Sequence, residues 1–148
     1  MVGGSGYITP PTITTSGGGG SNFSATAVLN TQSLSPTSPI TIVSGGTGYT
    51  TGQSLIFTGG GGTGAVGTIT ATSGVITAIT MVAFGSGYMT APVVSVSGAG
   101  SGANLTANLS GASIASINIT NGGSGYTSAP TLVFTATNGG SGASATLL

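Results

Sequence analysis

The sequence contains no Asp, Glu, Lys, Arg or His among its 148 residues. An average soluble chain carries about 25% charged residues. Without them, no side chain can act as a general acid or base near neutral pH, no carboxylate pair can hydrolyse a glycosidic bond, and no base activates a Ser or Thr hydroxyl. We therefore expect that the protein is not an enzyme.

Cysteine is absent as well. Together with the missing His, Asp and Glu, this excludes a zinc or transition-metal site, so we expect no metal and no cofactor. Nucleic acids and anionic membranes are bound mainly through Lys and Arg, which this sequence lacks. The longest apolar runs are a few residues long, whereas a membrane span needs roughly 20. We expect neither a nucleic-acid partner nor a membrane span.

Missing charge also removes two protections against association. Net charge keeps soluble proteins apart, and charged side chains guard exposed strand edges against pairing with other chains. With a hydrophobic content of 38%, the sequence nevertheless has enough apolar residues for a modest core. These features predict a folded chain that either associates with itself or lies inside an assembly.

What the sequence does contain is a recurring phrase of glycine, a hydroxyl residue, glycine and tyrosine. All four tyrosines, at positions 7, 49, 88 and 126, end such a phrase and are separated by 42, 39 and 38 residues. We call each one a tyrosine phrase: Gly4–Tyr7, Gly46–Tyr49, Gly85–Tyr88 and Gly123–Tyr126. A spacing of about 38–42 residues is typical of stacked or bladed repeat architectures.

Three short strands are predicted between successive phrases, and no stretch has a helical period. The first follows the phrase, the second follows a glycine cluster, and the third leads into the next phrase. The first strands are predicted at 12–15, 54–57, 93–96 and 131–134, the second at 25–29, 65–71, 103–109 and 143–147, and the third at 40–43, 76–82 and 114–119. The intervening glycine clusters, at 17–20, 59–62, 98–102 and 139–142, are interpreted as tight turns.

These strands predict an all-β fold with a single repeat domain over residues 1–148. Its units span approximately 3–43, 44–82, 83–120 and an incomplete 121–148. A β-solenoid, a stack of three-stranded meanders and a pseudo-symmetric prism all fit this pattern. We favour a solenoid-like or stacked-meander arrangement, alone or wound into a trimer.

The tyrosines have two interpretations. Tyr7, Tyr49, Tyr88 and Tyr126 could stack on sugar rings as a series of glycan contacts. Alternatively, each ring covers one end of the core, and its hydroxyl caps a turn. Because each tyrosine follows Gly-x-Gly, the structural interpretation is favoured.

The unit that begins Thr120-Asn121-Gly122-Gly123-Ser124-Gly125-Tyr126 and continues to Gly139-Gly140-Ser141-Gly142-Ala143 resembles the Gly-Ser-Gly-Tyr repeats of tailed-phage virion proteins, notably large tail fibres. Similar low-complexity β repeats occur in bacterial adhesins and extracellular fibres. The resemblance covers nearly the whole chain. It implies a structural or host-contacting component and transfers no catalytic residue.

We therefore expect a structural, self-assembling subunit of an extracellular filament or virion fibre. No predicted strand leads into the first phrase, and the fourth repeat unit ends after its second strand. Subunits stacked head to tail could pair these ends, within 143–148 and 2–7. The predicted assembly contacts are Val2, Gly3, Tyr7, Ala143, Ala145, Leu147 and Leu148. The alternative is a carbohydrate-binding adhesin or host-recognition module with polysaccharide as its partner.

Overall fold

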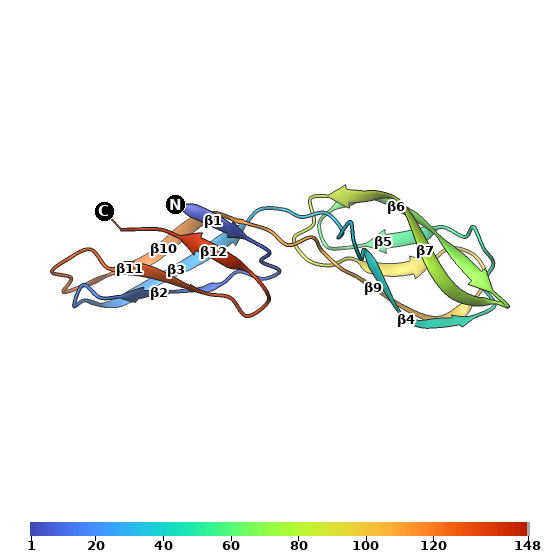
Figure 1. Ribbon diagram of the computed structural model, residues 1–148, viewed down its shortest axis with the longest axis horizontal. Coiled ribbons are helices and arrows are strands. Elements are labelled where there is room, and N and C mark those ends of the chain that lie inside the picture. The colour runs from blue at the N-terminus through green and yellow to red at the C-terminus, as the bar shows by residue number, and fades with distance from the viewer. Residues whose placement is uncertain (148) are drawn as a thin grey trace. The chain divides into compact units, whose positions relative to one another are not determined.

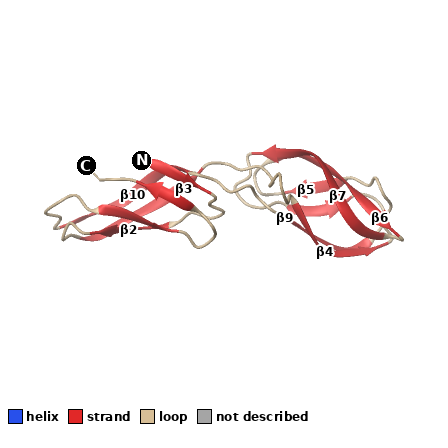
Figure 2. Ribbon diagram, in the orientation of Figure 1, coloured by secondary structure: helices blue, strands red, loops and turns tan. Residues whose placement is uncertain are grey.

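The structure is a computed structural model that describes residues 1–147. It consists of strands, turns and loops, and none of the described residues is helical (Figure 2). The prediction of an all-β fold is therefore confirmed. Its physical basis is the abundance of Val, Ile and Thr, whose branched side chains pack well on a pleated surface.

The described part of the chain forms twelve strands (Figure 1). Their bounds are β1 (Val2–Ser5), β2 (Thr12–Ser16), β3 (Ser21–Leu29), β4 (Ile40–Thr47), β5 (Leu55–Thr58), β6 (Thr63–Thr72), β7 (Val75–Ser86), β8 (Val93–Val96), β9 (Ser101–Ala107), β10 (Ile114–Ser124), β11 (Thr131–Thr135) and β12 (Ser141–Ser144).

The chain divides into two compact units. Unit 1 combines both ends of the chain, Met1–Asn30 and Gly111–Leu148, and unit 2 is the central stretch Thr31–Ser110. The single repeat domain expected over residues 1–148 does not include such a division. The division arises because strands near the start of the chain pair with strands near its end, β1 with β12, β2 with β11 and β3 with β10.

Unit 1 contains a four-stranded antiparallel sheet in the order β10-β3-β2-β11, and a ribbon in which β1 pairs with β12. A bridge between Thr131, the first residue of β11, and Thr146, two residues after the end of β12, connects these two strands. The six strands therefore form one row. The N- and C-terminal strands of the chain are neighbours in it, as the marked ends in Figure 1 show.

Unit 2 has the same order of connections. Its four-stranded sheet runs β4-β9-β8-β5, β6 pairs with β7, and a bridge between Ser54 and Thr68 links β5 to β6. In both units, each strand that leads into a tyrosine phrase pairs with a strand that follows a glycine cluster. Within residues 1–147 the strands form two four-stranded and two two-stranded antiparallel sheets, so the predicted solenoid-like or stacked-meander arrangement is not confirmed.

The cores follow from alternation along the strands. Ile13 and Leu132 lie in the unit 1 core, and Leu55 lies in the unit 2 core, each less than 10% exposed. All three are followed on their strands by an exposed residue, as the period of two of a half-buried strand requires. Ile69, on β6, is 1% exposed and is among the largest fully buried side chains.

The strands that lead into the phrases are longer than predicted. β10 continues through the glycines, where Gly122 is opposite Phe23 and Ser124 is opposite Ser21. Between them, Gly123 adopts a φ of 71°, and a Cβ there would lie 3.0 Å from the backbone nitrogen of Phe23. Only glycine combines this φ with such close strand approach, so the phrase is an irregular strand end.

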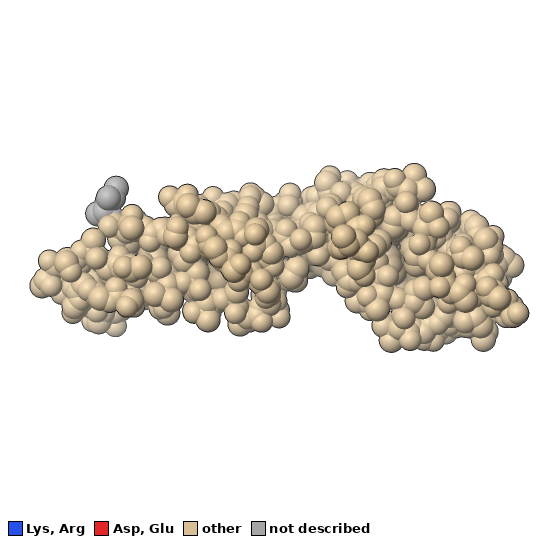
Figure 3. Space-filling model, in the orientation of Figure 1, with Lys and Arg blue, Asp and Glu red and all other residues tan. Residues whose placement is uncertain are grey.

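The surface carries no charge. The face drawn in Figure 3 shows no Lys, Arg, Asp or Glu, as the composition requires. Several exposed side chains are apolar, among them Val82 at 76% exposed, Val93 at 71% and Val43 at 62%. An ordinary soluble protein would separate such residues by charged neighbours.

Replacing Ile69 by alanine is expected to lower the free energy of unfolding by about 3 kcal/mol, because it leaves a cavity in a filled core. The matched variant Val66→Ala, on the same strand but 51% exposed, is expected to cost under about 1 kcal/mol. Urea denaturation followed by circular dichroism measures both values. Equal losses in the two variants would contradict the assigned faces of β6.

Candidate functional site

The four tyrosine rings are the first set of candidate residues. Tyr7 is 2% exposed, Tyr49 is 9% exposed and Tyr88 is 1% exposed. Tyr126 is only partly buried, and its hydroxyl lies 3.2 Å from that of Thr15. Stacking on a sugar needs an accessible ring face, which Tyr7, Tyr49 and Tyr88 do not offer in this structure.

Each ring lies against a glycine from a glycine cluster of the same compact unit. Tyr7 lies on Gly140, Tyr49 on Gly100, Tyr88 on Gly62 and Tyr126 on Gly20. A Cβ built on any of these glycines would overlap the ring. The glycine clusters therefore do more than make turns, because they also let aromatic rings approach the backbone closely.

Three tyrosines also pair with another backbone segment. Tyr7 exchanges hydrogen bonds with Ala112, whose N–H donates to the Tyr7 carbonyl at 2.7 Å. Tyr88 exchanges hydrogen bonds of 2.9 and 2.8 Å with Gln32. The N–H of Tyr49 donates to the carbonyl of Gly74 at 3.0 Å. In each case the pairing segment precedes a strand that leads into another tyrosine phrase.

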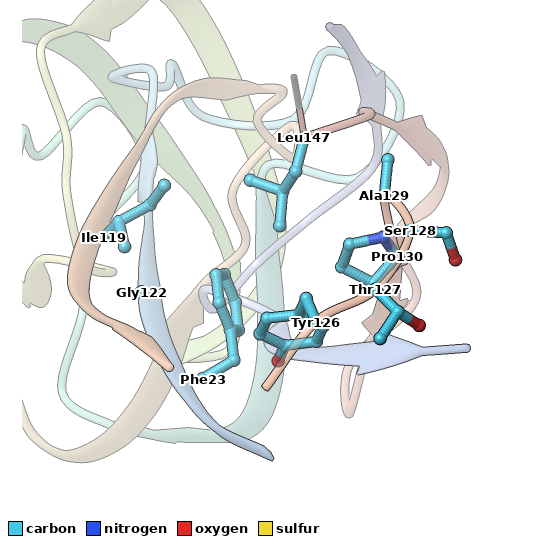
Figure 4. A pocket seen from close by; sticks show the side chains of 9 residues that line it. All are labelled: Phe23, Ile119, Gly122, Tyr126, Thr127, Ser128, Ala129, Pro130 and Leu147. Atoms are coloured by element: carbon cyan, nitrogen blue, oxygen red, sulfur yellow. The ribbon is translucent and has the colours of Figure 1, made fainter. Parts of the chain in front are cut away.

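Tyr126 differs from the other three. Among the described residues, no segment pairs with its backbone in this way. Instead, a groove of about 430 Å³ opens beside the ring, which we call the Tyr126 groove. Figure 4 shows Tyr126 and Pro130 on one side, Phe23 and Ile119 on the other, and Leu147 between them.

The predicted assembly contacts lie at the paired ends of unit 1. Val2 is opposite Ser144, and Gly3 is opposite Ala143. The backbone of Gly3 also packs closely against Ile114 on β10, while Ala145 and Leu147 are partly buried against the core. Tyr7 is buried, and Leu148 lies outside the described residues. The two ends expected to meet between chains thus meet within one chain.

The lining of the groove is mainly apolar, with the hydroxyl groups of Thr127 and Ser128 beside it. The sequence has no Asp, Glu, Lys, Arg, His or Cys, and no group of side chains within residues 1–147 could hold a metal ion through such ligands. None of the described residues forms a helix that is long and apolar enough to cross a membrane.

No protein-family model, curated protein or solved structure matches this chain.

Sequence reasoning found the tyrosines but missed their glycine partners and the residues that form the Tyr126 groove. The glycine partners share a position in the sequence, because each is the residue directly before the strand that follows its glycine cluster, β3, β6, β9 or β12. Phe23, Ile119 and Leu147 carry none, because they come from three distant segments.

We expect Gly62→Ala to destabilise the protein by about 1–3 kcal/mol, because the methyl group would overlap the Tyr88 ring and lie 2.7 Å from the Ser86 carbonyl. Gly122→Ala is the matched control, since nothing lies within 4 Å of a Cβ there. Neither glycine has a positive φ, so the comparison isolates steric overlap. Urea midpoints that move equally in both variants would disprove the ring contact as a constraint.

Proposed function

We propose that this protein is a structural, self-assembling subunit of an extracellular filament or virion fibre, associating through its β-strand edges. The observation that carries the proposal is the pairing of β1 with β12 at the two ends of a charge-free chain. No catalytic role and no nucleic-acid partner form part of it.

The pairing of β1 with β12 supports association because it joins short strands from opposite ends of the sequence. Val2, Gly3 and Ser5 are opposite Ser144, Ala143 and Ser141. Strands that are complementary within one chain are equally complementary between two chains. Exchange of an identical element between subunits costs little beyond opening the contact, and head-to-tail exchange continues into a polymer.

The surface supports the same proposal. No charge repels an approaching copy, and exposed valines such as Val43, Val82 and Val93 gain from burial. Attraction between charge-free surfaces is also insensitive to salt screening.

We further propose that the four tyrosine phrases mark copies of one repeated unit, and that pairs of copies make up each compact unit. The recurring pairing of phrase strands with strands after glycine clusters supports this interpretation. The resemblance to fibre repeats of tailed phages, carried by the phrase, supports a location on a virion surface or outside a cell.

The alternative is a carbohydrate-binding adhesin or host-recognition module. Tyr126 favours it among the four tyrosines, because its ring is only partly buried and exposed Thr127 and Ser128 follow it directly. An aromatic face beside hydroxyl groups is a surface on which a sugar ring can stack.

Concentrated protein is expected to form filaments, because the population of intermolecular β1–β12 pairs rises relative to that of intramolecular pairs as the concentration rises. Electron microscopy and sedimentation check this, and adding salt should leave the filaments intact. A monodisperse monomer at high concentration would contradict the proposal.

Cysteine variants identify the contact, since the native chain has no thiol. Val2→Cys and Ser144→Cys proteins of different mass, mixed and oxidised, should give a heterodimer in excess of that from Val82→Cys with Ser144→Cys. Equal yields would show that β1 and β12 do not pair between chains.

For the alternative, a glycan array should lose signal with Tyr126→Ala and keep it with Tyr126→Phe, because the ring provides the stacking face. Circular dichroism establishes that both variants are folded. Absence of binding by the unmodified protein would reject the carbohydrate function.

A further inference from the structure

No segment within residues 1–147 pairs with the backbone of Tyr126, whereas each of the other three tyrosines has such a segment beside it. Tyr7, Tyr49 and Tyr88 each receive a backbone hydrogen bond partner from a segment of their own unit. These partners are Ala112, Gly74 and Gln32. For Tyr126, the same place in the described structure is part of the Tyr126 groove.

The residue four positions before each tyrosine shows the same difference between Tyr126 and the other three. Four residues before the first two tyrosines, Gly3 and Gly45 pack against the backbones of Ile114 and Ile76. Four residues before Tyr88, the carbonyl of Phe84 accepts a hydrogen bond of 3.0 Å from the N–H of Leu34. Four residues before Tyr126, a Cβ on Gly122 would have no atom within 4 Å.

Burial of the ring also separates Tyr126 from the other three tyrosines. Tyr7, Tyr49 and Tyr88 are at most 9% exposed, whereas Tyr126 is only partly buried although it also lies on its glycine, Gly20. The difference therefore comes from the missing segment and not from the glycine contact.

The segment beside Tyr88 shows what chemistry such a place accepts. It is extended and uncharged, with Gln32 paired to Tyr88 and Leu34 two residues further on. Leu34 is 0% exposed and packs with Tyr88 and Ala107. In the Tyr126 groove, Phe23, Ile119 and Leu147 offer a comparable apolar lining, and no charged side chain is present to select a charged ligand.

We infer that the Tyr126 groove is a strand-addition site, and that its occupant is an extended, uncharged segment of a second copy of this chain, with an aliphatic side chain inserted between Phe23, Ile119 and Leu147. The Tyr126 backbone and the strand end at Gly122 then gain the hydrogen-bonding partners that the other phrases already have. A second copy is the occupant because every filled place of this kind holds a segment of this same chain. The inference rests on the proposed self-assembly and names one of its contacts.

A labelled peptide with the sequence of residues 30–36, Asn-Thr-Gln-Ser-Leu-Ser-Pro, serves as the probe of the groove. The full protein should bind it, with a change in the Tyr126 ring resonances in nuclear magnetic resonance spectra. A peptide with serine in place of the leucine should bind at least tenfold more weakly, because it lacks the aliphatic side chain.

Gly122→Leu tests the site within the protein. Gly122 lines the groove, and a Cβ there meets no atom within 4 Å, so the variant should fold normally, place its side chain in the groove and bind the peptide at least tenfold more weakly. Ser116→Leu is the matched control, because it adds the same side chain at an exposed position of the same strand. Equal peptide binding by both variants would overturn the inference.

Sedimentation separates this inference from the proposed function. Self-association that weakens in Gly122→Leu and persists in Ser116→Leu supports both the groove as a subunit contact and the proposed self-assembly. Self-association unchanged in Gly122→Leu overturns the groove as a subunit contact and leaves assembly through β1 and β12 standing. Peptide binding by a protein that stays monomeric at every concentration overturns the second copy as occupant, together with the proposed function.

Discussion

The contact between a tyrosine ring and a bare glycine is the constraint on which both units depend. The chain has four tyrosines, four phenylalanines and no tryptophan, so few side chains can cover much apolar area. Tyr7 and Tyr88 are among its largest fully buried side chains, and each lies against a glycine, Gly140 or Gly62, where a Cβ would overlap the ring. A buried aromatic ring covers about 150–250 Å², which is a large share of a core built from small residues.

The same constraint explains how distant strands are brought together. Tyr7 follows β1 and lies on Gly140, which precedes β12, and β1 pairs with β12. Tyr126 follows β10 and lies on Gly20, which precedes β3, and β10 pairs with β3. Ring stacking and strand pairing thus stabilise the same association of segments. Because the ends of the chain meet in this way, the contact that completes unit 1 is also one that two chains could share.

Four nearly identical phrases produce two kinds of surface. Three tyrosines are covered by neighbouring segments, and Tyr126 remains beside an apolar groove. In a chain without charge, such a groove has only shape, apolar area and backbone hydrogen bonds with which to select a partner. These interactions suit an uncharged strand, and the proposed assembly depends on them.

The sequence by itself determined the all-β class, the glycine turns and the buried faces of strands such as those containing Ile13 and Leu132, because alternation and turn chemistry are local properties. It also determined that no part of the fold carries an acidic or basic side chain, since Asp, Glu, Lys, Arg and His are missing. Only the tertiary structure decided that β1 pairs with β12, that the chain divides into two units, and that Tyr126 alone is left beside a groove. Those features depend on which distant segments meet, and phrases as alike as those of Tyr7 and Tyr126 contain no local information about that.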